Sequence, residues 1–162
     1  MRGSFSSFSD DQSLQQAIEA KQAALSSLCA QAAPIVSKMA ELIALAKQAK
    51  ACQNAVSSLS SIVATVVDSL NEISSLLQSA GTIDGKTFGG GTAANAGSIS
   101  GSISGAVAGI AGKVAQYINE KQREYEAVKI QYDSLKTQYM TLLASPPPCG
   151  GPSFPPAPEW SI

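Results

Sequence analysis

Apolar residues recur at alternating spacings of three and four along two long stretches of the chain, residues 9–80 and 96–144. This spacing places the side chains on one face of an α-helix. The first series contains Leu14, Ile18, Leu25, Leu28, Ala32, Ile35, Met39 and Leu42, and it continues as far as Leu77. Lys21 is the one charged residue that interrupts its early part. The pattern predicts a long helical arm over residues 9–80, preceded by a flexible segment, residues 1–8.

The second stretch predicts another helical arm, over residues 96–144. Its apolar series is Ile99, Ile103, Val107, Ile110, Val114 and Tyr117, followed by Val128, Tyr132, Leu135, Tyr139 and Leu142. Three prolines at 146–148 must end this helix, because proline lacks the N–H that a helix needs. Glycines dominate residues 81–95, which we expect to form a loop. Residues 145–162 are rich in proline and predict an extended tail of polyproline type.

Pro34 lies inside the first apolar series. A proline either kinks one long helix or stands in the first turn of a new one. The dipeptide Ala32-Ala33 before it suits the close of one helix, so we favour a break near residues 32–34. The apolar pattern carries across Pro34, and both parts are therefore expected to face the same partner.

A four-residue repeat of glycine marks the start of the second arm. It contains Gly97, Gly101, Gly105 and Gly109, and Gly112 follows three residues later. Each glycine costs a helix about 1 kcal/mol relative to alanine. On a helix, however, these glycines form a smooth strip that another backbone can approach closely. Together with Ile99, Ile103, Val107 and Ile110, the strip predicts a helix-packing interface; entry into a bilayer and a loose Gly-Ser linker are the alternatives.

These elements predict an all-α fold: an elongated antiparallel helical hairpin or coiled-coil-like bundle, with a glycine-rich connection and an extended proline-rich tail. Two arms rich in Ala and Ser bury little apolar surface per residue, and small domains are already marginally stable. We therefore expect the chain to gain stability as a homo-oligomer or inside a larger assembly.

Composition argues against most enzyme classes. The chain has 162 residues and contains no histidine, which removes the commonest general base and metal ligand. No phosphate-binding loop or dinucleotide fingerprint is present. Charged residues make up 14% and the formal net charge is −1, so a basic surface for nucleic acid is lacking. We predict a protein that is not an enzyme, with no catalytic, metal-binding or cofactor-binding residues.

The tail and the tyrosines indicate contacts rather than chemistry. Phe154, Pro155, Pro156 and Trp160 combine a stiff backbone with aromatic anchors, which suits docking into a groove on a partner. The alternative is a tail that packs back on its own helices through the tryptophan. Tyr117, Tyr125, Tyr132 and Tyr139 follow a near-heptad spacing, and we favour core filling over a membrane-interface belt.

The three cysteines are Cys29, Cys52 and Cys149. If the arms run antiparallel and turn near residue 89, Cys29 and Cys149 face each other at the open end of the hairpin. This register predicts a possible disulfide between them, which would imply an oxidising environment. Three thiols that act as small apolar residues are the alternative.

The functional prediction is a non-enzymatic subunit of a multi-protein particle, such as a phage virion, a tail or ejection device, or a secretion apparatus. It would lie in a virion or an extracellular or cell-envelope assembly, and no secretory signal peptide is visible. A membrane-active pore former or translocator component is the second hypothesis. A small adaptor or chaperone that presents its tail to one partner is the third.

Overall fold

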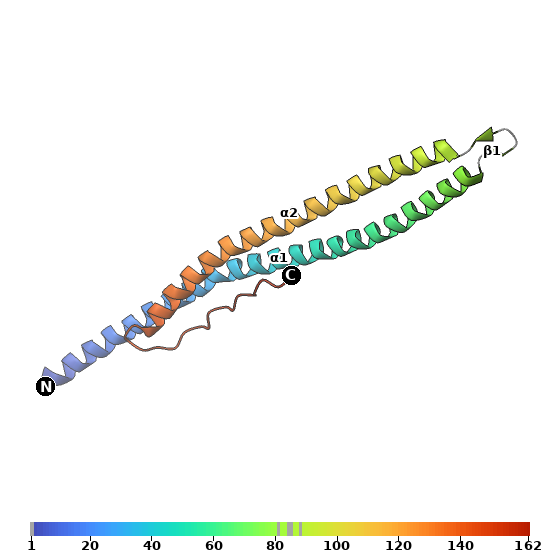
Figure 1. The fold of residues 1–162 in the computed structure, drawn as a ribbon. Coiled ribbons are helices and arrows are strands. Elements are labelled where there is room, and N and C mark those ends of the chain that lie inside the picture. The colour runs from blue at the N-terminus through green and yellow to red at the C-terminus, as the bar shows by residue number, and fades with distance from the viewer. Residues whose placement is uncertain (1, 81, 84–85, 88) are drawn as a thin grey trace. The chain divides into compact units, whose positions relative to one another are not determined.

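In a computed structural model, the chain is an all-α helical hairpin (Figure 1). Helix α1 spans Arg2–Ala80 and helix α2 spans Gly89–Ala144. Between them, strands β1 (Thr82–Ile83) and β2 (Lys86–Thr87) form an antiparallel pair in which Thr82 lies opposite Thr87. The backbone is described for residues 2–80, 82–83, 86–87 and 89–162, and side chains for residues 11–73, 75, 76, 79, 95 and 97–162. The predicted helical hairpin is confirmed.

Both helices begin earlier than the sequence predicted. Residues 2–8, expected to be flexible, belong to α1, because a helix propagates at little cost once its nucleus exists. Residues 89–95, expected to be loop, form the first turns of α2. The first four N–H groups of a helix have no partner within it, so the glycines at 89–91 forfeit few helical bonds there. Gly81, Asp84, Gly85 and Phe88 of the predicted loop lie outside the described residues.

The favoured break at Pro34 is wrong, because α1 continues through this residue. Proline leaves the carbonyl of Ala30 without its helical donor. Both Pro34 and Ala30 are exposed, so water is available to that carbonyl. On the opposite face, Ala32 and Met39 are fully buried on either side of the proline. Packing of this face therefore holds the helix together where local propensity would end it.

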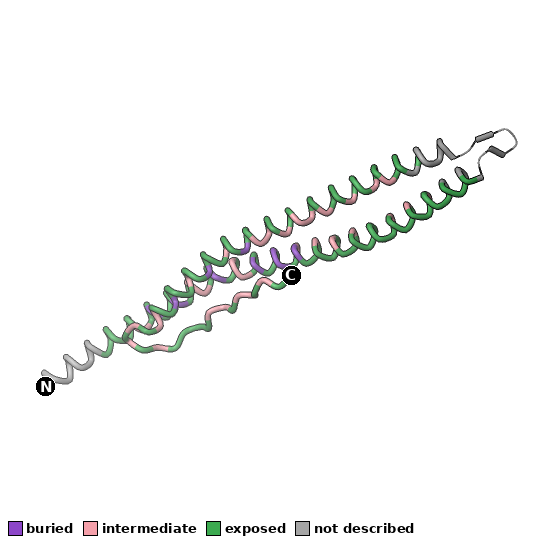
Figure 2. Tube along the Cα trace, in the orientation of Figure 1, coloured by how far each residue is buried: buried purple, intermediate pink, exposed green. Residues whose placement is uncertain are grey.

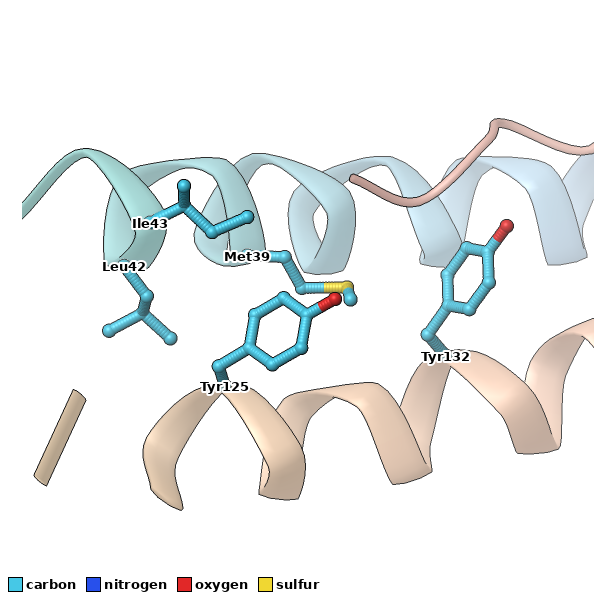
Figure 3. Packing of buried hydrophobic residues seen from close by; sticks show 5 residues of the cluster. All are labelled: Met39, Leu42, Ile43, Tyr125 and Tyr132. Atoms are coloured by element: carbon cyan, nitrogen blue, oxygen red, sulfur yellow. The ribbon is translucent and has the colours of Figure 1, made fainter. Parts of the chain in front are cut away.

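The chain divides into two compact units. The first contains residues 1–45 and 121–162, and the second contains residues 46–120. The hydrophobic core lies in the first unit, where Met39, Leu42 and Ile43 of α1 pack against Tyr125 and Tyr132 of α2 (Figure 3). Among the described residues of the second unit, only Ala46 is buried (Figure 2). The two units thus differ sharply in how much of their apolar surface the chain covers by itself.

Candidate functional site: the tail groove

In the first unit, the C-terminal tail lies against the two helices. Three tyrosines of α2 donate hydrogen bonds from their hydroxyl groups to backbone carbonyls of tail prolines. Tyr139 donates to Pro152 at 2.6 Å, Tyr132 to Pro155 at 2.7 Å, and Tyr125 to Pro158 at 2.6 Å. The tyrosine numbers rise as the proline numbers fall, so the tail runs antiparallel to α2.

The regular spacing of these bonds follows from the geometry of two different helices. Tyrosines seven residues apart lie about 10.5 Å apart along α2, at 1.5 Å per residue. Three residues of a polyproline II chain advance about 9.3 Å, at 3.1 Å per residue, and complete one turn. Seven helical residues and three tail residues therefore nearly match. Each tyrosine meets the same face of the tail one turn further along.

Burial along the tail has the same period of three. Ser153, Pro156 and Glu159 are exposed, whereas the residues between them are partly buried. A three-residue period is that of polyproline II, in which every third side chain points the same way. The face turned toward the helices carries Phe154, Ala157 and Trp160, all packed against the buried core. Proline at 155 and 158 supplies both stiffness and an accepting carbonyl.

Aromatic contacts add to the hydrogen bonds. The Phe154 ring lies 5.3 Å from the ring of Tyr132 and 5.2 Å from that of Tyr139, centroid to centroid. The Trp160 ring lies 5.3 Å from that of Tyr125, at an interplanar angle of 52°. Tilted pairs at this separation contribute about 0.5–1.5 kcal/mol each beyond the area they bury. We call the surface formed by Met39, Tyr125, Tyr132, Tyr139 and their neighbours the tail groove.

Buried Lys21 holds the turn that leads from α2 into the tail. Its Nζ donates to the carbonyls of Leu143 at 3.1 Å and Pro147 at 2.8 Å, and also to the carbonyl of Ser145. The three prolines at 146–148 have no N–H to offer the last carbonyls of α2. The ammonium of Lys21 supplies donors in their place, at the negative end of the helix dipole. This role of Lys21 was not predicted from the sequence, where the residue only interrupts an apolar series. A lone lysine in such a series was the available sign that its ammonium group has buried partners.

Two further contacts seat the start of the tail on α1. Gln22 donates from Nε2 to the carbonyl of Gly150 at 3.1 Å. Gly151 passes so close to fully buried Leu25 that a Cβ at this position would lie 2.7 Å from the leucine Cδ1. Glycine allows this close approach, and a larger residue would require the Leu25 side chain to shift.

The structure places the predicted tail residues on the chain itself. Phe154, Pro155 and Trp160, expected to dock on a partner, contribute contacts to the tail groove. Pro156 is exposed. The alternative in which the tryptophan packs back on the helices is the arrangement observed. Tyr125, Tyr132 and Tyr139 fill the core as expected, whereas Tyr117 is exposed.

All three cysteines are free thiols in this structure. The Sγ of Cys29 lies 3.8 Å from the carbonyl oxygen of Pro152 and 3.7 Å from that of Ser153, beneath the tail. Cys149 is partly buried and Cys52 is exposed. The Cys29–Cys149 bond is not formed here, and its formation under oxidising conditions stays a prediction. Within the described part of the chain, no three Cys, Asp or Glu side chains gather into a group that could hold a metal ion.

The second unit contains the glycine strip, but no other part of the described chain packs on it. A Cβ added at Gly97, Gly101, Gly105 or Gly109 would meet nothing within 4 Å. A groove of about 600 Å³ separates α1 from α2, lined by Val63 and Val67 on one side and by residues 100, 104, 107, 108 and 111 on the other. Three of the glycines directly follow a residue of this lining and are therefore turned about 100° away from it.

Within the chain, only part of the predicted packing face of α2 lies against α1. Val107 lines the groove and Ile103 is partly buried, but Ile99 and Ile110 are 47% and 46% exposed. Seven-residue steps back from Tyr132 reach Tyr125, Ile118, Ala111 and Ser104, so beyond Ile118 this heptad register turns small residues toward α1. Ile103 and Ile110 repeat at the same seven-residue step but one position earlier, which turns them about 100° from Ser104 and Ala111. Packing of the glycine strip against another chain stays a prediction.

Burial raises the pKa of the Tyr132 phenol above its ordinary value. A contact with the Ala157 backbone lowers this pKa, and the negative charge of Asp133 raises it. A raised pKa means that the folded state favours the neutral phenol. The tail bond of Tyr132 is therefore fully present below the ordinary tyrosine pKa of about 10 and is lost as pH rises through the folded value.

We expect the free energy of unfolding to stay level up to about pH 9 and to fall above about pH 10. Tyr132→Phe should lower the free energy of unfolding by about 1 kcal/mol at neutral pH. It should also flatten the fall of this free energy at alkaline pH, because the phenol that ionises is gone. Urea titrations followed by fluorescence of Trp160, the only tryptophan, measure both effects. Tyr117→Phe, at an exposed tyrosine, is the matched control. An unchanged alkaline decline in Tyr132→Phe would contradict the assignment.

No protein-family model, curated protein or solved structure matches this chain. The features of the molecule that bear on function are therefore the tail groove and the uncovered face of the second unit.

Proposed function

We propose that this chain is a non-enzymatic structural subunit that assembles in several copies through its second unit. The observation that carries the proposal is the contrast in burial between the two units. The first unit encloses a core, although Leu14, Ile130, Met140 and Ile162 are exposed in it. The described residues of the second unit bury only Ala46 and leave more of their large apolar side chains in solvent. The exposed ones are Leu59, Ile62, Val66, Ile73 and Leu76 on α1 and Ile99 and Ile110 on α2.

An apolar surface of this kind favours association. Single exposed hydrophobic residues are ordinary, but a group of them on one pair of helices is typical of a protein or membrane contact. The glycine strip adds a place where a backbone could approach closely, because nothing in the described chain lies within 4 Å of its added Cβ positions. Few charges oppose association, since charged residues make up only 14% of the chain.

The kind of particle is argued from general character. A small helical hairpin rich in Ser, Ala, Gln and Gly, with no histidine, suits a component of a phage virion, a tail or ejection device, or a secretion apparatus. Its place would then be a virion or an extracellular or cell-envelope assembly. Its partners would be further copies of itself and other structural proteins of the same particle.

Light scattering of the purified protein over a range of concentrations tests the proposal. A discrete multimer that persists on dilution is the expected result. Ile62→Asp and Ile110→Asp should each lower its mass, because a carboxylate on the apolar face opposes burial. Ser102→Asp, at an exposed polar position on α2, is the control and should leave the mass unchanged. A monomer at every concentration would contradict self-assembly.

Gly105→Leu separates the role of the glycine strip from that of the fold. The structure has open space at Gly105, so leucine should fit and stabilise the helix by up to about 1 kcal/mol. If the strip packs against another copy, the multimer should dissociate while the circular dichroism melting curve holds or rises. Gly105→Ala, which adds one methyl group, is the milder comparison. A multimer that survives Gly105→Leu would exclude the strip from the interface.

A second candidate function is entry into a membrane. Among the described helices, the stretch Asp11–Ile73 of α1 contains a window long and apolar enough to cross a bilayer, with 22% of that window buried. Core helices of soluble proteins pass the same test of length and composition. Dye release from liposomes of neutral and anionic lipid separates the two functions. Leakage that Ile62→Asp abolishes would favour a pore former, and absence of leakage at every pH and composition would count against one.

A further inference from the structure

The tail groove binds the tail through hydroxyl groups and aromatic rings. Every copy of the chain carries a tail that can make the same contacts. Its three hydroxyl groups, on Tyr125, Tyr132 and Tyr139, bind backbone carbonyls. Its aromatic faces receive Phe154 and Trp160. The ligand class is therefore a polyproline II segment with acceptors three residues apart and aromatic residues on the inner face. The tail of a second copy meets this specification as fully as the chain's own tail does.

The tail is free to leave its seat without losing structure of its own. Polyproline II has no internal hydrogen bonds, and proline keeps the free segment close to the bound conformation. Every backbone-carbonyl bond described for residues 152–158 is made to a helix side chain, from Cys29 or one of the three tyrosines. A stiff segment of this kind loses little entropy when it binds again, on the same copy or on another.

The segment that would act as the hinge is short and clearly bounded. It runs from Ser145 to Gly151 and contains three prolines and two glycines. Lys21 holds its first half through the carbonyls of Ser145 and Pro147, and Gln22 holds Gly150. Release of these two side chains, together with the tyrosine hydrogen bonds and the aromatic contacts of the tail groove, would let the tail swing out as a unit. Exchange of an identical segment between copies costs little, because the same contacts form again in the new pair.

We propose that the tails exchange between neighbouring copies, so that residues 152–160 of one chain occupy the tail groove of the next. This inference rests on the proposed multi-copy assembly, which brings the copies together. A short flexible link gives an effective concentration in the millimolar range, and copies packed in a particle reach comparable local concentrations. Exchange would then link adjacent copies through their first units, while the apolar faces of the second units provide the other contact.

Photo-crosslinking between copies labelled with light and heavy isotopes tests the exchange on the full chain. The variant carries Ser153→Cys as its only cysteine, with Cys29→Ser, Cys52→Ser and Cys149→Ser, and a benzophenone maleimide is attached at position 153. Ser153 is exposed, so the label leaves the seat intact, and residue 29 of α1 lies beneath it. Equal amounts of light and heavy isotope copies are refolded together, illuminated and digested, and tail-to-α1 cross-links are identified by mass spectrometry.

Random exchange predicts that half of the cross-links join a light tail to a heavy α1 or the reverse, and that this share persists on dilution for as long as the multimer does. Copies refolded separately and mixed just before illumination give the background from chance contact. A mixed share no greater than this background would overturn the proposal, because each tail then stays on its own chain. Phe154→Ala should reduce all tail-to-α1 cross-links, which shows that they report the seat.

Light scattering of the same samples tests the proposed assembly separately from the tail exchange. A multimer without mixed cross-links would leave the proposed assembly standing and remove tail exchange alone. A monomer with cross-links only within single copies would contradict both. Exchange predicts a multimer with mixed cross-links. Phe154→Ala, which truncates an aromatic contact of the tail groove, should lower the number of these cross-links severalfold.

Discussion

Leu42→Ala should lower the free energy of unfolding by about 3 kcal/mol, whereas Leu59→Ala should lower it by less than about 1 kcal/mol. The two substitutions remove the same atoms from the same helix. Leu42 is fully buried in the core of the first unit, and Leu59 of the second unit is 44% exposed. A cavity follows only where surrounding side chains cannot close the gap, which is the situation around Leu42.

Urea denaturation followed by circular dichroism and by the fluorescence of Trp160 measures this difference. Trp160 packs against the core of the first unit, so its signal follows the part of the chain that Leu42 supports. Light scattering of Leu59→Ala adds a second readout, because Leu59 would affect the mass rather than the stability of one copy if the proposed assembly buries it. Equal losses of unfolding free energy in the two variants would contradict the description of two unequal units.

Lys21→Met should lower the free energy of unfolding by about 2–3 kcal/mol, although methionine has nearly the same length and is more apolar. The reason lies in the acceptors that remain. The carbonyls of Leu143, Ser145 and Pro147 lose the ammonium that they share, and the nearby prolines offer no N–H in exchange. Leaving these partly buried acceptors without donors costs more free energy than is gained by no longer burying the lysine ammonium.

The fluorescence midpoint of Trp160 and the rate of proteolysis within residues 145–162 both report on this change. Loss of Lys21 should release the tail before the helices unfold, so cleavage of the tail should accelerate more than the melting temperature falls. Lys38→Met is the matched control, since Lys38 is half exposed and its ion pair with Glu41 is worth at most about 0.5 kcal/mol. An equal effect of the two substitutions would exclude Lys21 as the anchor of the turn.

The features that could be predicted from the sequence are those with a signal in neighbouring residues. Apolar periodicity predicted two long helices, three consecutive prolines predicted the end of the second, and the heptad of Tyr125, Tyr132 and Tyr139 predicted core filling. Each of these depends on the chemistry of a few neighbouring residues. Helical spacing, the missing N–H of proline and the burial of an aromatic side chain act in the same way wherever the rest of the chain lies.

Tertiary structure decided the features that depend on distant residues. Pro34 stays within a helix because packing of Ala32 and Met39 on the opposite face outweighs one lost hydrogen bond. Small residues of α2, rather than Ile99 and Ile110, face α1, because the register follows the tyrosines further along the same helix.

The position of the tail and its contact with Lys21 also depend on distant residues. A proline-rich segment has no internal hydrogen bonds, so only the helices beside it determine where it lies. Proline content and the aromatic residues Phe154 and Trp160 were enough to predict a stiff, extended and aromatic tail. Lys21 caps α2 only because folding brings it into contact with carbonyls more than a hundred positions away. The position of the tail also depends on tertiary contacts, since the three tyrosines bind carbonyls 13 to 33 positions further along the chain.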